Sequence, residues 1–69
     1  MSPEISTAMD AVVGRLRAHG QEFIGDLVAF LSSIYSASVL RTAIWILVCA
    51  GTISVDSNYL ASIPVVAAA

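Results

Sequence analysis

The side chains that could carry out chemistry are few and far apart in this chain of 69 residues. The single histidine, His19, is followed by Glu22 one helical turn later, a spacing that could present two ligands to a metal ion. A metal centre needs more ligands that converge, and haem or chlorophyll ligands belong inside an apolar segment, which His19 precedes. His19 is therefore the one candidate for cofactor binding, with a solvated histidine as the alternative, and we predict no cofactor and no metal.

The other reactive groups do not form a catalytic arrangement either. Cys49 is the only cysteine, so an internal disulfide is excluded and a packing role is expected. Asp26 and Arg41 are too far apart in the sequence to meet on one helix, which argues against a proton relay. No nucleophile–base pair, glycine-rich phosphate loop or Cys-x-x-Cys motif is present. We predict that the protein is not an enzyme.

Composition narrows the classes of partner. The net charge is −2, and the cations are three arginines without any lysine, whereas a nucleic-acid-binding protein needs several clustered cations. We therefore predict no nucleic-acid partner. The chain is 58% apolar and 12% charged, about half of the charge of an ordinary domain. So much apolar surface predicts contact with lipid or with a partner protein.

An amphipathic helix is expected over residues 3–22. Its apolar residues recur every three or four positions, as in Ile5, Met9, Val12 and Leu16. Ser2 before Pro3 suits a helix start, and Thr7 with Asp10 offers a second possible start. Gly20, after His19, is the expected bend in this helix.

The apolar region 23–55 predicts a transmembrane helix. No charged residue lies between Arg41 and Asp56, and about 20 apolar residues suffice to cross a bilayer. Tyr35 and Tyr59 would anchor the helix at opposite interfaces, and Arg41 would reach back to the headgroups. All three arginines precede the span, so the rule that cations stay inside predicts a cytoplasmic N-terminus.

The predicted fold class follows from these segments. It is all-α: one unit over residues 1–69, with an amphipathic N-terminal helix continuing into, or bent against, a single transmembrane helix. Residues 56–69 form a short C-terminal tail, because Pro64 prevents a continuous helix there. A hairpin of two apolar helices about Arg41 is the alternative.

Small residues suggest how the helix would pack. Gly25, Ala29, Ser33 and Ala37 recur at four-residue spacing, which on one helix makes a smooth stripe for a neighbouring helix. Trp45 is too deep for an interfacial anchor, so it would pack internally or face a partner or a pigment.

These features predict a non-catalytic accessory subunit that stabilises a larger membrane protein complex of respiratory or photosynthetic type. One bent helix has no core of its own and needs neighbours. A self-assembling protein, such as a pilin, a virion coat subunit or a holin, is the alternative, and it would be a homo-oligomer. A third class is an electron-transfer or pigment-binding subunit that uses His19. With its amphipathic start and apolar span the chain superficially resembles the bacterial light-harvesting polypeptides, but the region of their pigment-ligating histidine reads Arg41-Thr42-Ala43 here.

Overall fold

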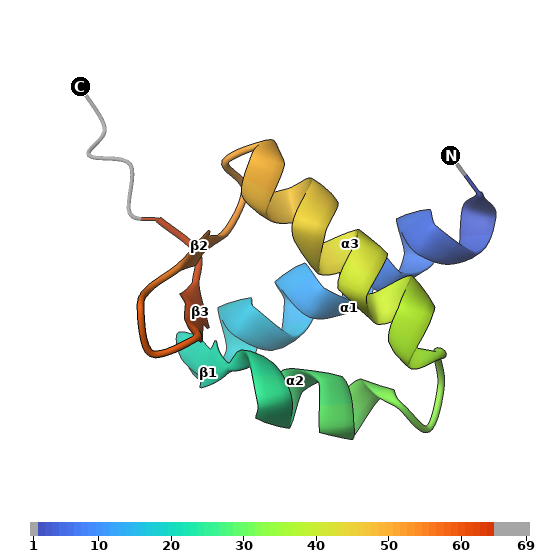
Figure 1. The fold of residues 1–69 in the computed structure, drawn as a ribbon, viewed down its shortest axis with the longest axis horizontal. Helices are drawn as coiled ribbons and strands as arrows, with labels where there is room; N and C mark the ends of the chain where they lie inside the picture. Colours follow the sequence, from blue (N-terminus) through green and yellow to red (C-terminus); the bar gives the residue numbers. More distant parts are fainter. Residues whose placement is uncertain (1, 65–69) are drawn as a thin grey trace.

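The computed structural model describes residues 2–64 and contains helices and a small antiparallel sheet (Figure 1). The helices are α1 (Pro3–His19), α2 (Ile24–Leu31) and α3 (Ala37–Cys49). The strands are β1 (Gln21–Phe23), β2 (Ser54–Val55) and β3 (Leu60–Ser62). The predicted all-α fold is therefore wrong.

Helix α1 begins and ends at residues whose types suit those positions. The Ser2 hydroxyl accepts a hydrogen bond from the backbone N–H of Ile5 at 3.3 Å, and Pro3 occupies the first turn. Of the two predicted starts, Ser2 is thus the observed one. The helix ends at Gly20, whose φ of 80° is a conformation that a side chain would disfavour. This turn sends the chain into β1.

Two glycines in this region are expected to respond oppositely to alanine. Gly14 is exposed within α1, and a Cβ there would meet no other atom within 4 Å, so Gly14→Ala should stabilise the fold by about 0.5–1 kcal/mol. Gly20→Ala should destabilise it by about 1–3 kcal/mol, because of its positive φ. Urea unfolding measures both changes. Equal effects of the two substitutions would contradict the turn at Gly20.

The apolar region 23–55 is two helices rather than one. Helix α2 ends at Leu31, and the Ser36 hydroxyl caps α3 by accepting from the backbone N–H of Val39 at 3.2 Å. In the connecting residues 32–36, the Ser32 hydroxyl donates to the Ala29 carbonyl oxygen at 2.8 Å. Serine side chains compete in this way for backbone groups and favour a break.

The interruption removes the predicted membrane span. Helix α3 has 13 residues, about 20 Å at 1.5 Å per residue, whereas the hydrocarbon core is about 30 Å thick. Within residues 2–64, no helix combines the length and apolar character that a bilayer crossing requires. The prediction of a single-pass membrane protein with a cytoplasmic N-terminus is therefore wrong.

The segment predicted as a tail contains the central strand of the sheet. The strand order is β1-β3-β2, and both pairs are antiparallel. Ala61 of β3 lies opposite Glu22 of β1 and opposite Val55 of β2. Strand β3 thus pairs with β1, which lies about 40 positions earlier in the chain. No local sequence pattern reveals a contact over this separation.

A tight turn connects β2 to β3. The Asp56 carboxylate accepts hydrogen bonds from the backbone N–H groups of Asn58, at 2.8 Å, and Leu60, at 3.0 Å. Tyr59 has a φ of 60°, an uncommon value for a residue with a side chain. Asp56, Ser57 and Asn58 are typical turn residues, so the polar break in the sequence is a hairpin turn.

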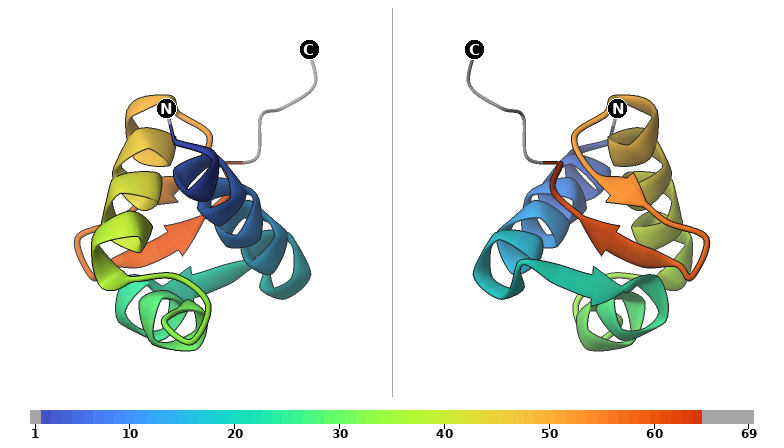
Figure 2. Two further views of the ribbon diagram at one scale, coloured as in Figure 1. Left: turned by 90° about the vertical axis from the view of Figure 1, so that its right-hand side faces the viewer. Right: turned by 90° about the vertical axis from the view of Figure 1, so that its left-hand side faces the viewer.

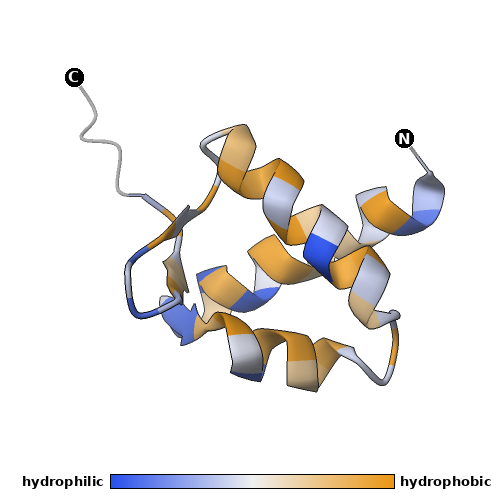
Figure 3. Ribbon diagram, in the orientation of Figure 1, coloured by the Kyte–Doolittle hydropathy of each residue, from blue (hydrophilic) through white to orange (hydrophobic). Residues whose placement is uncertain are grey.

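One hydrophobic core holds these elements together. Figures 1 and 2 show the three helices on one side of the sheet, where α1 packs against α3 and α2 lies across one end, and Figure 3 shows hydrophobic residues on all three helices. The buried core residues are Ala8, Val12, Leu16, Leu27, Leu31, Leu40, Ala43, Ile44, Leu47, Ile53 and Ala61. Much of the apolar content read as lipid-facing is therefore buried inside the protein.

The second half of the fold consists of two consecutive helices followed by a β-hairpin. Helices α2 and α3 are consecutive and joined by residues 32–36, and the hairpin β2–β3 follows, closing on β1. A fold of this kind fixes which surfaces are available but does not by itself assign a function.

Candidate functional site

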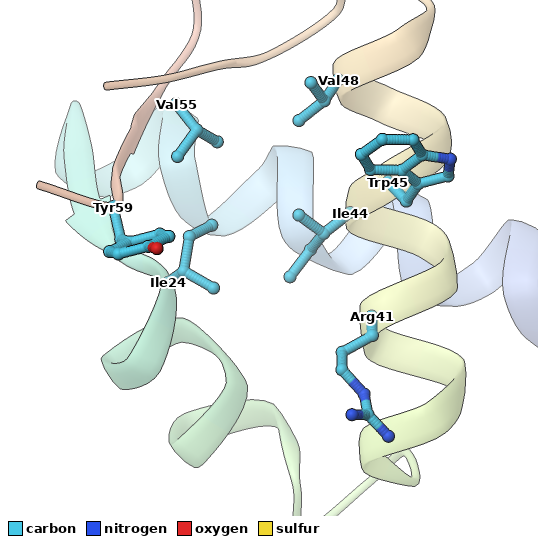
Figure 4. A pocket seen from close by; sticks show the side chains of 7 residues that line it. All are labelled: Ile24, Arg41, Ile44, Trp45, Val48, Val55 and Tyr59. Atoms are coloured by element: carbon cyan, nitrogen blue, oxygen red, sulfur yellow. The ribbon is translucent and has the colours of Figure 1, made fainter. Parts of the chain in front are cut away.

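An apolar groove lies between α3 and the side of the protein formed by the start of α2 and the β2–β3 hairpin (Figure 4). Its volume is about 280 Å³. The residues that line it are Ile24, Arg41, Ile44, Trp45, Val48, Val55 and Tyr59, and all except Arg41 are hydrophobic or aromatic. Arg41 is the one charged residue among them.

The helical repeat of α3 places one wall of the groove. Arg41, Trp45 and Val48 are four and three residues apart, so they lie on one face of the helix, and Ile44 beside them is buried. The opposite wall comes from Ile24 and from the hairpin.

A backbone contact fixes the opposite wall. The Ile24 N–H, at the start of α2, donates a hydrogen bond to the Tyr59 carbonyl oxygen at 2.8 Å. This bond ties the start of α2 to the turn between β2 and β3. The position of Tyr59 therefore depends on the sheet as well as on its own turn.

Two aromatic side chains flank the opening and face solvent. Trp45 is 68% exposed and Tyr59 is 71% exposed, and Figure 4 shows them on opposite sides of the groove. Trp and Tyr are the residue types that contribute most to protein–protein binding energy. Exposed apolar surface that borders a cavity is typical of a binding site.

A second hollow, of about 450 Å³, lies between α1 and the end of α3. Its residues include Asp10 and Arg17, which carry opposite charges, and Gly14. It has no aromatic side chain. The groove along α3 is therefore the better candidate site.

The remaining charged cluster holds the fold together. Arg15 of α1 donates from Nε to Glu22 Oε1 at 2.6 Å and from Nη2 to Oε2 at 2.8 Å. The Arg15 guanidinium also lies over the Phe30 ring, 3.5 Å from its centre. Arg15 thus links α1 to β1 and to α2, and this partly buried cluster is already paired.

Removal of the Glu22 carboxylate should reveal this structural role. Glu22→Ala leaves the partly buried Arg15 without its bidentate partner, and we expect the free energy of unfolding to fall by about 1.5–3 kcal/mol. Asp26→Ala is the control, because Asp26 is exposed and should change stability by less than about 0.5 kcal/mol. Chemical denaturation of both variants provides the measurement. A loss no larger than that of the control would show that the ion pair is unimportant.

His19, the candidate for cofactor binding, lines neither the groove along α3 nor the second hollow. His19 is exposed at the end of α1, and Glu22, its predicted neighbour in a ligand pair, is paired with Arg15. In the described part of the chain, no group of three or more His, Cys, Asp or Glu residues could hold a metal ion.

The predicted packing stripe is divided between elements. Gly25 and Ala29 lie on α2, Ser33 lies in the connection, and Ala37 begins α3. All four residues are exposed. The four-residue spacing does not produce one stripe, because the helix on which it depends is interrupted.

The three predicted interfacial anchors have different surroundings. Arg41 and Tyr59, expected near opposite membrane surfaces, line the same groove. Tyr35 is half-buried and packs against the core. The sequence singled out Arg41, Trp45 and Tyr59, but it gave no reason to bring them together. Ile24 and Val55 were missed, since their place in the groove depends on the unpredicted sheet.

No known protein family, curated protein or solved structure matches the chain.

Proposed function

We propose that the protein is a non-catalytic accessory subunit that binds a partner protein through the groove along α3. The observation that supports this proposal is the exposure of Trp45 and Tyr59 beside an apolar cavity. An exposed pair of large aromatic residues gains more from contact with an apolar protein surface than from water. The volume, about 280 Å³, lies just below the range of ordinary small-molecule sites and suits one or two side chains of a partner.

The proposal keeps the accessory role predicted from the sequence but changes its physical basis. The protein has a core of its own, so the need for a partner comes from the exposed groove rather than from an unburied helix. A membrane environment is no longer part of the proposal. The respiratory or photosynthetic character of the partner complex stays a prediction.

Affinity purification of tagged protein tests this role. The wild-type protein should recover a partner at about one copy each. Trp45→Ala should reduce the recovery by about 30-fold or more, since a binding hot spot contributes 2 kcal/mol or more. Ser57→Ala, an exposed substitution in the hairpin turn, is the matched control and should retain the partner. Circular dichroism should show both variants folded.

Two results would contradict the accessory role. One is wild-type protein that purifies without a stoichiometric partner. The other is recovery that does not depend on Trp45. Wild-type protein that assembles into many identical copies, measured by sedimentation, would support the self-assembling alternative instead.

Duplex DNA is a second candidate partner because two consecutive helices followed by a hairpin, as α2, α3 and β2–β3 are, resemble a winged helix-turn-helix. In such proteins the start of the second helix contacts bases, and here the first turns of α3 expose Ser38, Arg41 and Thr42. The electrostatics oppose this function. Arg41 is the only cation on α3, and Asp56 lies in the hairpin turn, whereas DNA binding depends on several cations that neutralise phosphates.

Fluorescence anisotropy with a labelled 20-base-pair duplex separates the two candidates. The accessory role predicts no saturable binding at micromolar protein in 50 mM salt. DNA binding predicts saturation that weakens steeply when the salt is raised to 200 mM and that is lost in Arg41→Gln.

A further inference from the structure

The position of Arg41 indicates what kind of partner segment the groove accepts. Arg41 precedes Trp45 by one turn on α3 and lies at one end of the groove (Figure 4). Among residues 2–64, the only ion pair joins Arg15 to Glu22. The Arg41 guanidinium has no carboxylate of the described chain within 4.0 Å and makes no side-chain hydrogen bond with any described residue.

The surroundings of Arg41 favour an ion pair with an anionic group of a bound ligand. Apolar side chains of Ile44, Trp45 and Val48 continue along the same wall. A ligand that covers these side chains excludes water from them. An ion pair formed with Arg41 at the end of this wall is then stronger than an ion pair in open solvent. A guanidinium also binds a carboxylate through two parallel hydrogen bonds, which fixes the orientation of the ligand.

We propose that the groove binds a partner protein segment in which an apolar side chain is followed closely by an Asp or Glu. The apolar side chain lies between Trp45 and Tyr59, and the carboxylate pairs with Arg41. This inference rests on the proposed accessory function and specifies the partner's chemistry. The groove lined by these residues is open, and nothing in the described chain occupies it.

Titrations of the full chain with peptides, monitored by NMR, test the inference. The probes are acetylated and amidated hexapeptides that place one Asp among Leu, Phe and Ala at different spacings, with Asn twins of identical sequence. We expect the best Asp peptide to bind about tenfold more tightly than its twin. Its largest shifts should occur at the Arg41 side chain, the Trp45 indole and Tyr59.

Two variants assign the two parts of the ligand. Arg41→Gln should bind the Asp and Asn peptides equally, which removes the tenfold preference while retaining the weaker apolar binding. Trp45→Ala should weaken both peptides to a similar extent. Failure of every Asp peptide to bind at millimolar concentration, or equal affinity for the Asp and Asn twins in the wild type, would overturn the inference.

The failure of this inference differs from failure of the proposed function. A groove that does not bind the Asp peptides, in a protein whose partner is still lost with Trp45→Ala, would leave the accessory role intact and remove only the acidic partner segment. Concentration-dependent dimerisation that depends on Arg41 and Trp45 would identify a second copy of this chain as the occupant and would also overturn the acidic partner segment.

Discussion

Ala61→Asp is expected to unfold the protein. Ala61 is 0% exposed and lies in β3, the strand paired on both sides. An aspartate there would place an unpaired carboxylate in the core, and the resulting destabilisation should exceed about 4 kcal/mol. A chain of this length has a total stability of only about 3–10 kcal/mol. Circular dichroism should therefore show the loss of the cooperative thermal transition.

Ser57→Asp is the matched control for this substitution. It introduces the same side chain four positions earlier, at an exposed site in the hairpin turn, and should change stability by less than about 0.5 kcal/mol. If Ala61→Asp melted like the control, residues 60–62 would not form a buried central strand, and the description of this segment as a tail would be restored.

Leu40→Ala should cause the second largest loss. Leu40 lies in α3, is 0% exposed and belongs to the core. Removal of its side chain leaves a cavity, and such substitutions cost about 2–5 kcal/mol. Urea denaturation measures the change, and we expect the midpoint to fall steeply because the total stability of a small domain is of similar size.

Ile34→Ala distinguishes core from surface in the same apolar region. Ile34 is 67% exposed in the connection before α3, so its loss should cost less than about 0.5 kcal/mol. Similar losses of stability for Leu40→Ala and Ile34→Ala would contradict a packed core that buries Leu40 and leaves Ile34 exposed.

The sequence predicted elements whose signals are local. Ser2, Pro3 and the three-to-four-residue apolar period predicted a helix that begins where α1 begins, and Gly20 marks its end. The strands were not predicted, because they span two or three residues each, too few for an alternating pattern to be read. Their pairing joins β1 to β3 across most of the chain.

The apolar region was misassigned for a different reason. An uncharged run that contains Leu40, Ile44 and Leu47 reads the same whether those residues face lipid or one another. The break at Ser32 to Ser36 decided the outcome, because it shortens the helices and lets them pack against a sheet. The candidate groove could not be predicted for the same reason, since one of its walls comes from the hairpin.

The fold depends on β3, which closes a sheet between β1 and β2 against the helices. Cross-strand nuclear Overhauser effects of the isotope-labelled full chain test it most directly. We expect contacts from Ala61 to both Glu22 and Val55, its partners on the two neighbouring strands. Sequential helical contacts through Ala61, with no contact to either partner, would contradict the three-stranded sheet.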